Sequence, residues 1–211
     1  MVDNERFVEM IRCAAGQIRG NQALLSKLDS QGGDGDHGTT MVRAMNCIEQ
    51  AVEENRSSAL KDLLQAIGWA VMGVDGGATG PLFGTFFMSM SDAAADKDAL
   101  DARGIAEALA AGLAGVQKRT RAQVGDKTMI DALVPAVEAA QSAAESGGSV
   151  ADVLRSASEA AETGAESTAA LQARFGRAKN IGEKSIGQPD AGATSVSLIF
   201  KGFLEGVTSH A

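Results

Sequence analysis

The stretch Leu60-Lys-Asp-Leu-Leu-Gln-Ala-Ile-Gly-Trp-Ala-Val71 carries the pattern that decides the fold. Its large aliphatic side chains stand at positions 60, 63, 64, 67 and 71, so they recur every three or four residues. That spacing places them along one face of an α-helix, whereas a half-buried strand would alternate every second residue. The stretch therefore predicts a helix that turns one face toward a hydrophobic core.

The same period recurs along the rest of the chain and predicts eight helices. They cover residues 7–25, 41–52, 60–71, 82–90, 105–116, 130–137, 149–174 and 196–207. Pro135 lies inside the sixth pattern, where we expect it to kink or split the helix. No convincing two-residue alternation and no Asn-Gly turn indicates a strand. The sequence therefore predicts an all-α bundle or barrel, with residues 1–211 forming a single domain.

Composition narrows the class of protein further. The chain has 211 residues, of which 45% are apolar and only 4% aromatic, which suits closely packed helices. The formal net charge of -8, without a basic stripe, argues against a nucleic-acid partner. No apolar run resembles a signal peptide or approaches the roughly 18 residues of a membrane span. We therefore expect a cytoplasmic protein that binds no membrane, with Cys13 and Cys47 as buried thiols.

Three aspartates follow the first predicted helix. Asp34 and Asp36 are two residues apart, so in an extended loop their carboxylates point the same way. Asp29 lies five residues before Asp34, and the glycines between them allow the loop to fold back. Carboxylates about 5 Å apart repel by roughly 3 kcal/mol per pair at an effective dielectric near 20, and a magnesium ion reverses that repulsion. The loop predicts either a magnesium site or an acidic, solvated turn in which Asp36 caps the next helix.

A helix start follows these aspartates directly. Gly38, Thr39 and Thr40 open it, and their free N–H groups with two hydroxyls would form an anion site. As the beginning of a helix alone, the same residues would need no further explanation. His37 either contacts a phosphate there or is an ordinary turn residue.

A second glycine-rich segment, Gly76-Gly-Ala-Thr-Gly-Pro81, precedes the fourth predicted helix. Its glycines permit positive φ angles and let the backbone approach a ligand, and Thr79 adds a hydroxyl. It is not a Walker A loop, because no Gly-Lys-Ser/Thr follows, nor a dinucleotide fingerprint, because no strand precedes it. It predicts either a ligand-contacting loop or a tight turn between helices.

Charged residues gather in two later loops. In the first, Gly125 to Met129, Thr128 is expected to cap a helix and Lys127 to be solvated. The last long loop or its flanks carry Arg174, Arg177, Lys179, Lys184 and Asp190. In an acidic protein this local cationic group would complement nucleotide phosphates, although a solvated run of charges would look the same.

Taken together, these segments resemble the nucleotide-binding L subunit of bacterial dihydroxyacetone kinase. The resemblance covers essentially the whole chain in order. The matching segments are residues 28–29, 33–38, 76–84, 125–129, 172–174, 176–178, 185–187 and 190–195.

The resemblance implies an eight-helix antiparallel barrel that binds ADP or ATP at one rim. It also implies that two magnesium ions are held by three aspartates, which match Asp29, Asp34 and Asp36. The positions that match nucleotide contacts are His37, Gly38, Thr39, Thr40, Ala78, Thr79, Thr120, Met129, Arg177, Asp190, Ala191 and Gly192. Within this set, Met129 and Thr120 match the adenine side, and Arg177 with 190–192 matches the loop that closes over the nucleotide.

The resemblance further implies a catalytic complex rather than a lone enzyme. The ketose, dihydroxyacetone, is held by a separate K subunit. Its own hydroxyl group is the nucleophile, so no covalent protein nucleophile is needed. ADP would be a bound cofactor recharged by a phosphotransferase-system M subunit. The alternatives are a kinase subunit using exchanging ATP on dihydroxyacetone or another ketose such as erythrulose, a relative of the fatty-acid kinase nucleotide domain, and a non-catalytic nucleotide-binding regulator. A homodimer stays open as an oligomeric state.

Overall fold

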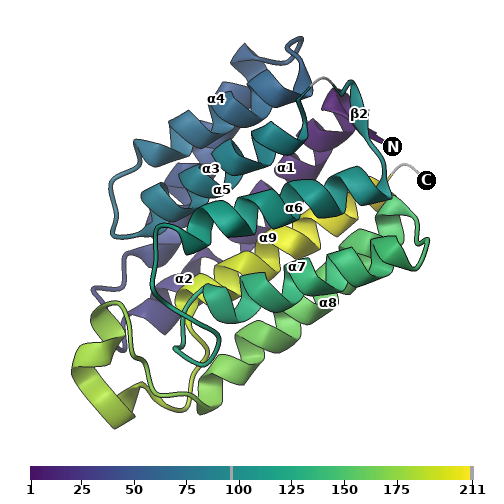
Figure 1. Cartoon of the computed structure of the whole chain (residues 1–211). Coiled ribbons are helices and arrows are strands. Elements are labelled where there is room, and N and C mark those ends of the chain that lie inside the picture. Colours follow the sequence, from purple (N-terminus) through teal and green to yellow (C-terminus); the bar gives the residue numbers. More distant parts are fainter. Residues whose placement is uncertain (96, 210–211) are drawn as a thin grey trace.

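A computed structural model describes residues 1–95 and 97–209 and is built almost entirely of helices (Figure 1). The all-α class predicted from the sequence is confirmed. The α-helices are α1 (Asn4–Gly20), α2 (Gln22–Asp29), α3 (His37–Glu54), α4 (Leu60–Met72), α5 (Thr79–Ala93), α6 (Ala102–Gln117), α7 (Ile130–Glu145), α8 (Val150–Ser167) and α9 (Ala191–Thr208). Two 3₁₀ segments, η1 (Thr168–Ala170) and η2 (Arg177–Ser185), lie between α8 and α9.

Neighbouring helices in the chain are also neighbours in space. From α3 to α9 each α-helix packs against the next, α9 packs against α1, and α1 packs against α3. The apolar faces of these helices share one hydrophobic cluster, to which the 60–71 pattern contributes its five large aliphatic side chains. The loops therefore gather at the ends of the helices. One end carries η2 and the polar loops, and Figure 1 shows β2 and the N-terminus at the opposite end.

Two of the predicted helices are interrupted or end early, at positions that tertiary contacts decide. The 7–25 pattern forms two helices that break at Asn21, whose backbone N–H bonds to Gln17 O and Ile18 O and whose side chain also donates to Gln17 O. The 149–174 helix ends at Ser167, because the buried Thr168 begins a 3₁₀ turn instead. Its capping box is present, with Ser149 and Asp152 exchanging hydrogen bonds as their spacing indicates.

The expectation of no strand is wrong at one place. Val2–Asp3 (β1) and Ala99–Leu100 (β2) form a two-stranded antiparallel pair. Strands of two residues are too short to show an alternating pattern, so the sequence gives no sign of them. None of the described helices is long and apolar enough to cross a membrane.

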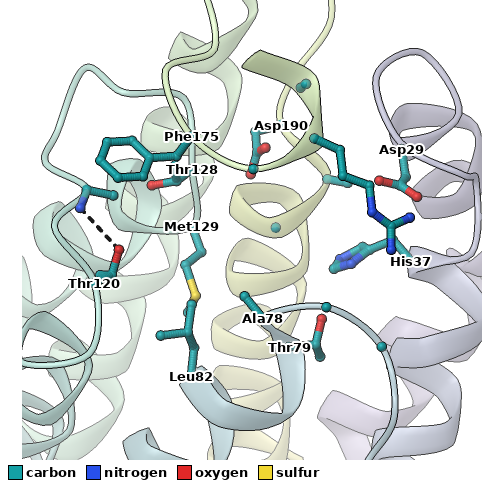
Figure 2. A pocket seen from close by; sticks show the side chains of 18 of the residues that line it. Asp29, His37, Ala78, Thr79, Leu82, Thr120, Thr128, Met129, Phe175 and Asp190 are labelled. Atoms are coloured by element: carbon teal, nitrogen blue, oxygen red, sulfur yellow. Dashed lines mark hydrogen bonds between the residues drawn. The ribbon is translucent and has the colours of Figure 1, made fainter. Parts of the chain in front are cut away.

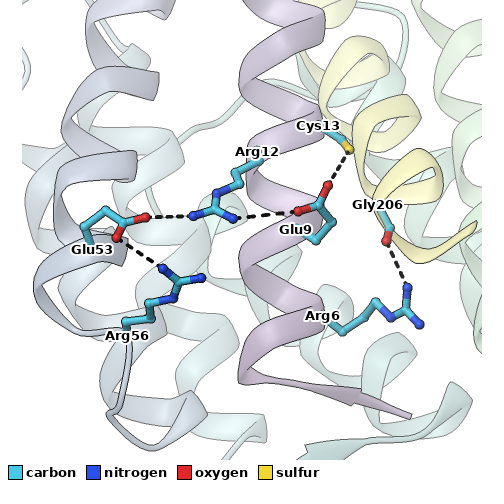
Figure 3. A network of polar contacts seen from close by, with 7 residues as sticks. All are labelled: Arg6, Glu9, Arg12, Cys13, Glu53, Arg56 and Gly206. Carbon is cyan, nitrogen blue, oxygen red and sulfur yellow. Dashed lines mark hydrogen bonds and ion pairs between the residues drawn. The ribbon is translucent and has the colours of Figure 1, made fainter. Parts of the chain in front are cut away.

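Polar contacts on the outside of α1 connect it to its neighbours (Figure 3). The guanidinium of Arg12 donates to Glu53 at 2.8 Å, and Arg56 pairs with the same carboxylate at 3.6 Å. The Cys13 thiol donates to Glu9, and burial, followed by the negative charge of Glu9, raises the pKa of Cys13. The ion pairs are half-exposed, so each contributes about 0–1 kcal/mol. Cys13 and Cys47 are free thiols as expected, but both are only partly buried.

Pro135 does not split its helix. α7 runs without interruption from Ile130 to Glu145, and the proline leaves the carbonyl of Asp131 without its usual helical donor. α8 comes closest at this point, because a Cβ atom on Gly164 would lie only 2.2 Å from the Asp131 oxygen. The absence of a side chain at Gly164 therefore allows the two helices to pack backbone against backbone.

Gly164→Ala should lower the free energy of unfolding by about 1–3 kcal/mol, because the new methyl group has to push α8 away from α7. Gly16→Ala is the matched control, since Gly16 is also helical but has no atom within 4 Å of its would-be Cβ. It should instead stabilise the protein by roughly 0.5–1 kcal/mol. Urea unfolding followed by circular dichroism measures both. Equal effects at the two glycines would contradict the packing argument.

Candidate functional site

A cavity of about 370 Å³ opens at the end of the bundle where the polar loops gather (Figure 2). Its size lies within the ~300–1,000 Å³ range of small-molecule sites. Five parts of the chain line it: the end of α2 with the start of α3, residues 76–83, residues 120–130, residues 175–178 and residues 190–192. Segments far apart in the sequence therefore meet around one space.

The three predicted aspartates converge at one side of this cavity. Oxygen atoms of Asp29, Asp34 and Asp36 all lie within 4.8 Å of one another. The loop folds back as expected, because Gly35 adopts a φ of 77° and donates its N–H to Asp29 at 2.9 Å. Asp36 occupies the N-cap position of α3 but makes no capping hydrogen bond. A cluster of carboxylate oxygens that is not consumed by capping fits a hard cation such as magnesium.

Arg177 supplies positive charge at this cluster. Its guanidinium pairs with Asp34, and that hydrogen bond is the main reason why the pKa of Asp34 falls to about 2. The pKa of Asp36 moves the other way, because burial and then the neighbouring Asp34 disfavour its charged form. The carboxylates thus carry more negative charge than one arginine neutralises.

His37 connects the start of α3 to α9. Its Nε2 lies 2.8 Å from the hydroxyl oxygen of Ser195, and that hydroxyl donates to the carbonyl of Ala191 at 3.0 Å. Because the hydroxyl proton is used there, Nε2 must be the donor in its bond to Ser195. Burial lowers the pKa of His37, which favours the neutral ring. The ring therefore has a defined orientation beside the aspartates.

The remaining predicted positions divide between those on the cavity wall and those off it. Thr40 and Thr79 are buried on the wall, where Ala78, Thr120, Met129 and 190–192 also lie. Gly38 and Thr39 do not line the cavity. Gly38 packs against the backbone of α2, and the exposed Thr39 hydroxyl accepts from Gln22. Asp34 is outside the wall as well, although it belongs to the aspartate cluster.

The wall changes character from one end to the other. Figure 2 shows Asp29 and His37 on one side, and Leu82, Met129 and Phe175 on the other. On the apolar side the Thr120 hydroxyl accepts from the N–H of Ala122 and so is directed into its own loop. Phe175 was not singled out from the sequence, because a single aromatic residue in a polar loop carries no periodic signal.

Lys127 is not solvated, contrary to the expectation from its charged loop. Only 6% of the residue is exposed, and its Nζ donates to the carbonyl oxygens of Thr168 and Gln188, both at 2.6 Å. Thr128, which is expected to cap a helix, lies one residue before Met129, the N-cap of α7. Asp131 accepts from the N–H of Thr128, while the Thr128 hydroxyl accepts from Ile130 rather than Asp131.

The expected cationic group of the last loop reduces to one residue at the cavity. Arg177 lines it, whereas Arg174 pairs with Asp126 at 3.4 Å on the outside. Lys179 and Lys184 are exposed and lie off the wall. Asp190 accepts from the N–H of Ala193 as the N-cap of α9, and burial raises its pKa to about 6.

Comparison with known proteins agrees with this geometry. The family model described as the DAK2 domain matches residues 31–205. This chain belongs to the DAK2 domain family. The matched region includes Asp34, Asp36 and every part of the cavity wall except Asp29.

Two curated proteins similar to this DAK2 domain are of nearly the same length. The ADP-binding subunit DhaL of PEP-dependent dihydroxyacetone kinase 1 from Listeria innocua is 38% identical over 189 residues, which are 90% of this chain and 89% of that protein. The ADP-binding subunit DhaL of the Escherichia coli PEP-dependent kinase is 38% identical over 177 residues, 84% of each chain. The resemblance to L subunits of dihydroxyacetone kinase is thus confirmed.

A solved structure shares the fold of this DAK2 domain. The dihydroxyacetone kinase of C. freundii in complex with AMP-PNP and Mg²⁺ superposes with a TM-score of 0.74 at 27% identity. The match covers 94% of this chain but only 33% of that one, so the DAK2 domain spans about a third of the larger kinase.

Arg177→Ala should tighten magnesium binding to the nucleotide-free DAK2 domain, because Asp34 loses the cation that competes with the metal. Because the pair is exposed to solvent, its contribution is small and the gain in affinity should be at most roughly fivefold. Isothermal titration with MgCl₂ measures it. Arg174→Ala removes an equally exposed arginine that pairs with Asp126 instead, and it should leave the affinity unchanged. A weaker or unchanged affinity in Arg177→Ala would contradict the competition.

Proposed function

We propose that this chain binds a magnesium–nucleotide complex and acts as the nucleotide-binding subunit of a dihydroxyacetone kinase, with residues 1–211 as one nucleotide-binding domain. The polarity of the cavity carries the proposal. An apolar end with Leu82, Met129 and Phe175 faces a charged end with Asp29 and His37. A purine base fits the first and a chain of phosphates fits the second. The printed names of the relatives, ADP-binding subunits, support the same ligand.

Helix N-termini provide much of the attraction for phosphate. α3, α5 and α9 all begin at the cavity, and first-turn residues of each helix lie on its wall. Their free N–H groups and aligned peptide dipoles favour an anion there. The buried hydroxyls of Thr40 and Thr79 add donors at the starts of α3 and α5. These groups therefore favour phosphate binding even though the chain as a whole is acidic.

Asp29, Asp34 and Asp36 would hold two magnesium ions, which supply the charge that neutralises the phosphates for in-line transfer. The donor set fits, because three carboxylates with oxygens within 4.8 Å leave coordination positions for phosphate oxygens and water. With nucleotide bound, Arg177 would leave Asp34, contact the phosphates and shield them from water. The chain itself orients the nucleotide and needs no side chain that forms a covalent phosphoryl intermediate.

The acceptor is dihydroxyacetone held by a separate K subunit, and ADP stays bound while a phosphotransferase-system M subunit recharges it. Support comes from relatives named PEP-dependent or PTS-dependent, which this chain matches over nearly their full length. An L-erythrulose 1-kinase from Mycolicibacterium smegmatis is 36% identical, but this chain spans only 33% of it. A kinase subunit that exchanges free ATP on another ketose is therefore the second candidate. Both candidates would act in the cytoplasm.

Asp34→Ala should weaken magnesium-dependent ADP binding by at least roughly a hundredfold, because even residues that only orient a metal ligand contribute about 10–100-fold to metal affinity. The helical circular dichroism signal should stay the same, since Asp34 lies in an exposed loop. Asp75→Ala is the matched control: it is an exposed aspartate beside the glycine loop but off the wall. Calorimetric titration with ADP and MgCl₂ distinguishes them. Full ADP affinity in Asp34→Ala would refute the site assignment.

The phosphate donor is tested with the purified complex. In the retained-cofactor mechanism, the protein carries ADP through gel filtration. It also phosphorylates dihydroxyacetone from phosphoenolpyruvate when K, M and general phosphotransferase proteins are added. Rapid exchange with labelled ATP, and turnover on ATP alone, would establish the second candidate instead. Nucleotide binding without phosphoryl transfer in either assay would leave only a regulatory role.

A further inference from the structure

A buried ammonium lies under the last loop, where the charges of Asp190 and Asp131 act on it but neither carboxylate forms an ion pair with it. Among the described residues Lys127 makes no ion pair, and its Nζ is bonded to two backbone carbonyls. It also has a φ of 59°, an unusual conformation for a residue with a side chain. A buried charge is costly unless it is hydrogen-bonded, so the two carbonyl groups that accept from Lys127 indicate why it is buried.

The two carbonyls belong to opposite ends of the segment that connects α8 to α9. Thr168 follows α8 and Gln188 precedes α9, and the segment 168–190 between the two helices carries Phe175 and Arg177. Two further bonds close the same base. The N–H of Asp190 donates to the Thr168 hydroxyl, and the N–H of Gly187 donates to Ala169 O, both at 2.8 Å. Lys127 thus lies where the segment leaves the helices and returns to them.

The segment also has internal bonds and a contact at its tip. The buried Ser185 hydroxyl accepts from the N–H of Ala173 at 2.9 Å and donates to Gly182 O at 2.6 Å. Phe175 and Arg177 both line the cavity, and Arg177 reaches across to Asp34. A third attachment lies at Arg174, whose N–H donates to Asp126 O at 3.1 Å and whose guanidinium pairs with the Asp126 carboxylate. With its interior bonded, the position of the segment over the cavity depends on its base, its tip and this contact next to Lys127.

We propose that Lys127 is a positioning residue whose ammonium fastens both ends of the segment 168–190, and that this clamp sets how slowly the nucleotide leaves the cavity. The inference rests on the proposed nucleotide site. A lysine suits the task because its three N–H donors rotate on a flexible stem and satisfy two carbonyls from different segments at once. Lys127 lies on the loop that also carries Met129, so the clamp joins the apolar wall to the segment that covers it.

Lys127→Met tests the clamp, because it keeps most of the length of the side chain and removes every side-chain donor. Dissociation of magnesium-bound N-methylanthraniloyl ADP, chased with excess ADP, should become at least about tenfold faster. Lys184→Met is the matched control: this exposed lysine lies in the same segment but off the cavity wall, so its rate should equal that of the wild type. An unchanged rate in Lys127→Met overturns the proposal.

A double-mutant cycle with Arg177→Ala separates positioning from a general loss of stability. If Lys127 acts through the segment, its substitution should accelerate dissociation less in the Arg177→Ala background than in the wild type. Equal acceleration in both backgrounds would show that Lys127 acts independently of the segment and would overturn the proposal. Thr168→Val, which removes the acceptor for the Asp190 N–H, should accelerate dissociation in the same direction. Should Lys127→Met not fold, a wild-type rate in Thr168→Val overturns the clamp.

Amide hydrogen exchange tests the clamp without nucleotide. In the nucleotide-free protein, Lys127→Met should increase exchange at the amides of Gly187 and Asp190, which are bonded at the base of the segment. Exchange should stay unchanged in Lys184→Met. Unchanged protection in Lys127→Met overturns the clamp whether or not ADP binds. Increased exchange in a protein whose wild type shows no ADP binding would instead refute the proposed function and leave the clamp as a structural device.

Discussion

The close approach of α9 to α1 is the contact on which the site depends. At Gly202 and Gly206, a Cβ atom would lie 2.3 Å from Ala14 Cα and 2.4 Å from Met10 Cα, so only glycine lets the two backbones come this near. α1 and α9 are the first and last α-helices, and their packing brings the two ends of the helical chain together. The same packing fixes where α9 begins, and residues 190–192 at that end form one part of the cavity wall.

The helix N-termini that meet at the cavity also determine which charge a ligand must carry. The N-termini of α3, α5 and α9 at one cavity attract negative charge, but the aspartate cluster repels it. A phosphate chain with divalent cations satisfies both, whereas a bare anion or a bare cation satisfies only one. The hydrogen bond between His37 and Ser195 connects the starts of α3 and α9 and so keeps these two N-termini close together. The proposed ligand therefore follows from the combination of charges and not from any single residue.

How much of this could be predicted from the sequence depends on how local each feature is. The 60–71 helix and the Ser149–Asp152 capping box involve residues a few positions apart, and both are confirmed. The clustering of Asp29, Asp34 and Asp36 could be inferred for the same reason. Lys127 was misjudged because its partners lie 41 and 61 residues away, so nothing nearby in the sequence indicates that it is buried. The helix breaks at Asn21 and Ser167 likewise depend on packing that no periodic pattern records.

Besides the contact of Arg174 with Asp126, the segment 168–190 is attached at its base and at its tip, and these two respond differently to a ligand. The base is held by two backbone carbonyls around one ammonium and by the N–H groups of Gly187 and Asp190, and none of the acceptors is a carboxylate for which a metal would compete. The tip is held by Arg177 on Asp34, and both a metal at Asp34 and a phosphate near Arg177 compete for that pair. Binding of magnesium and nucleotide would therefore break the tip contact and replace it, while the base keeps its geometry. A segment hinged in this way can exchange its contacts at the aspartates without leaving the cavity, which suits a nucleotide that stays bound between turnovers.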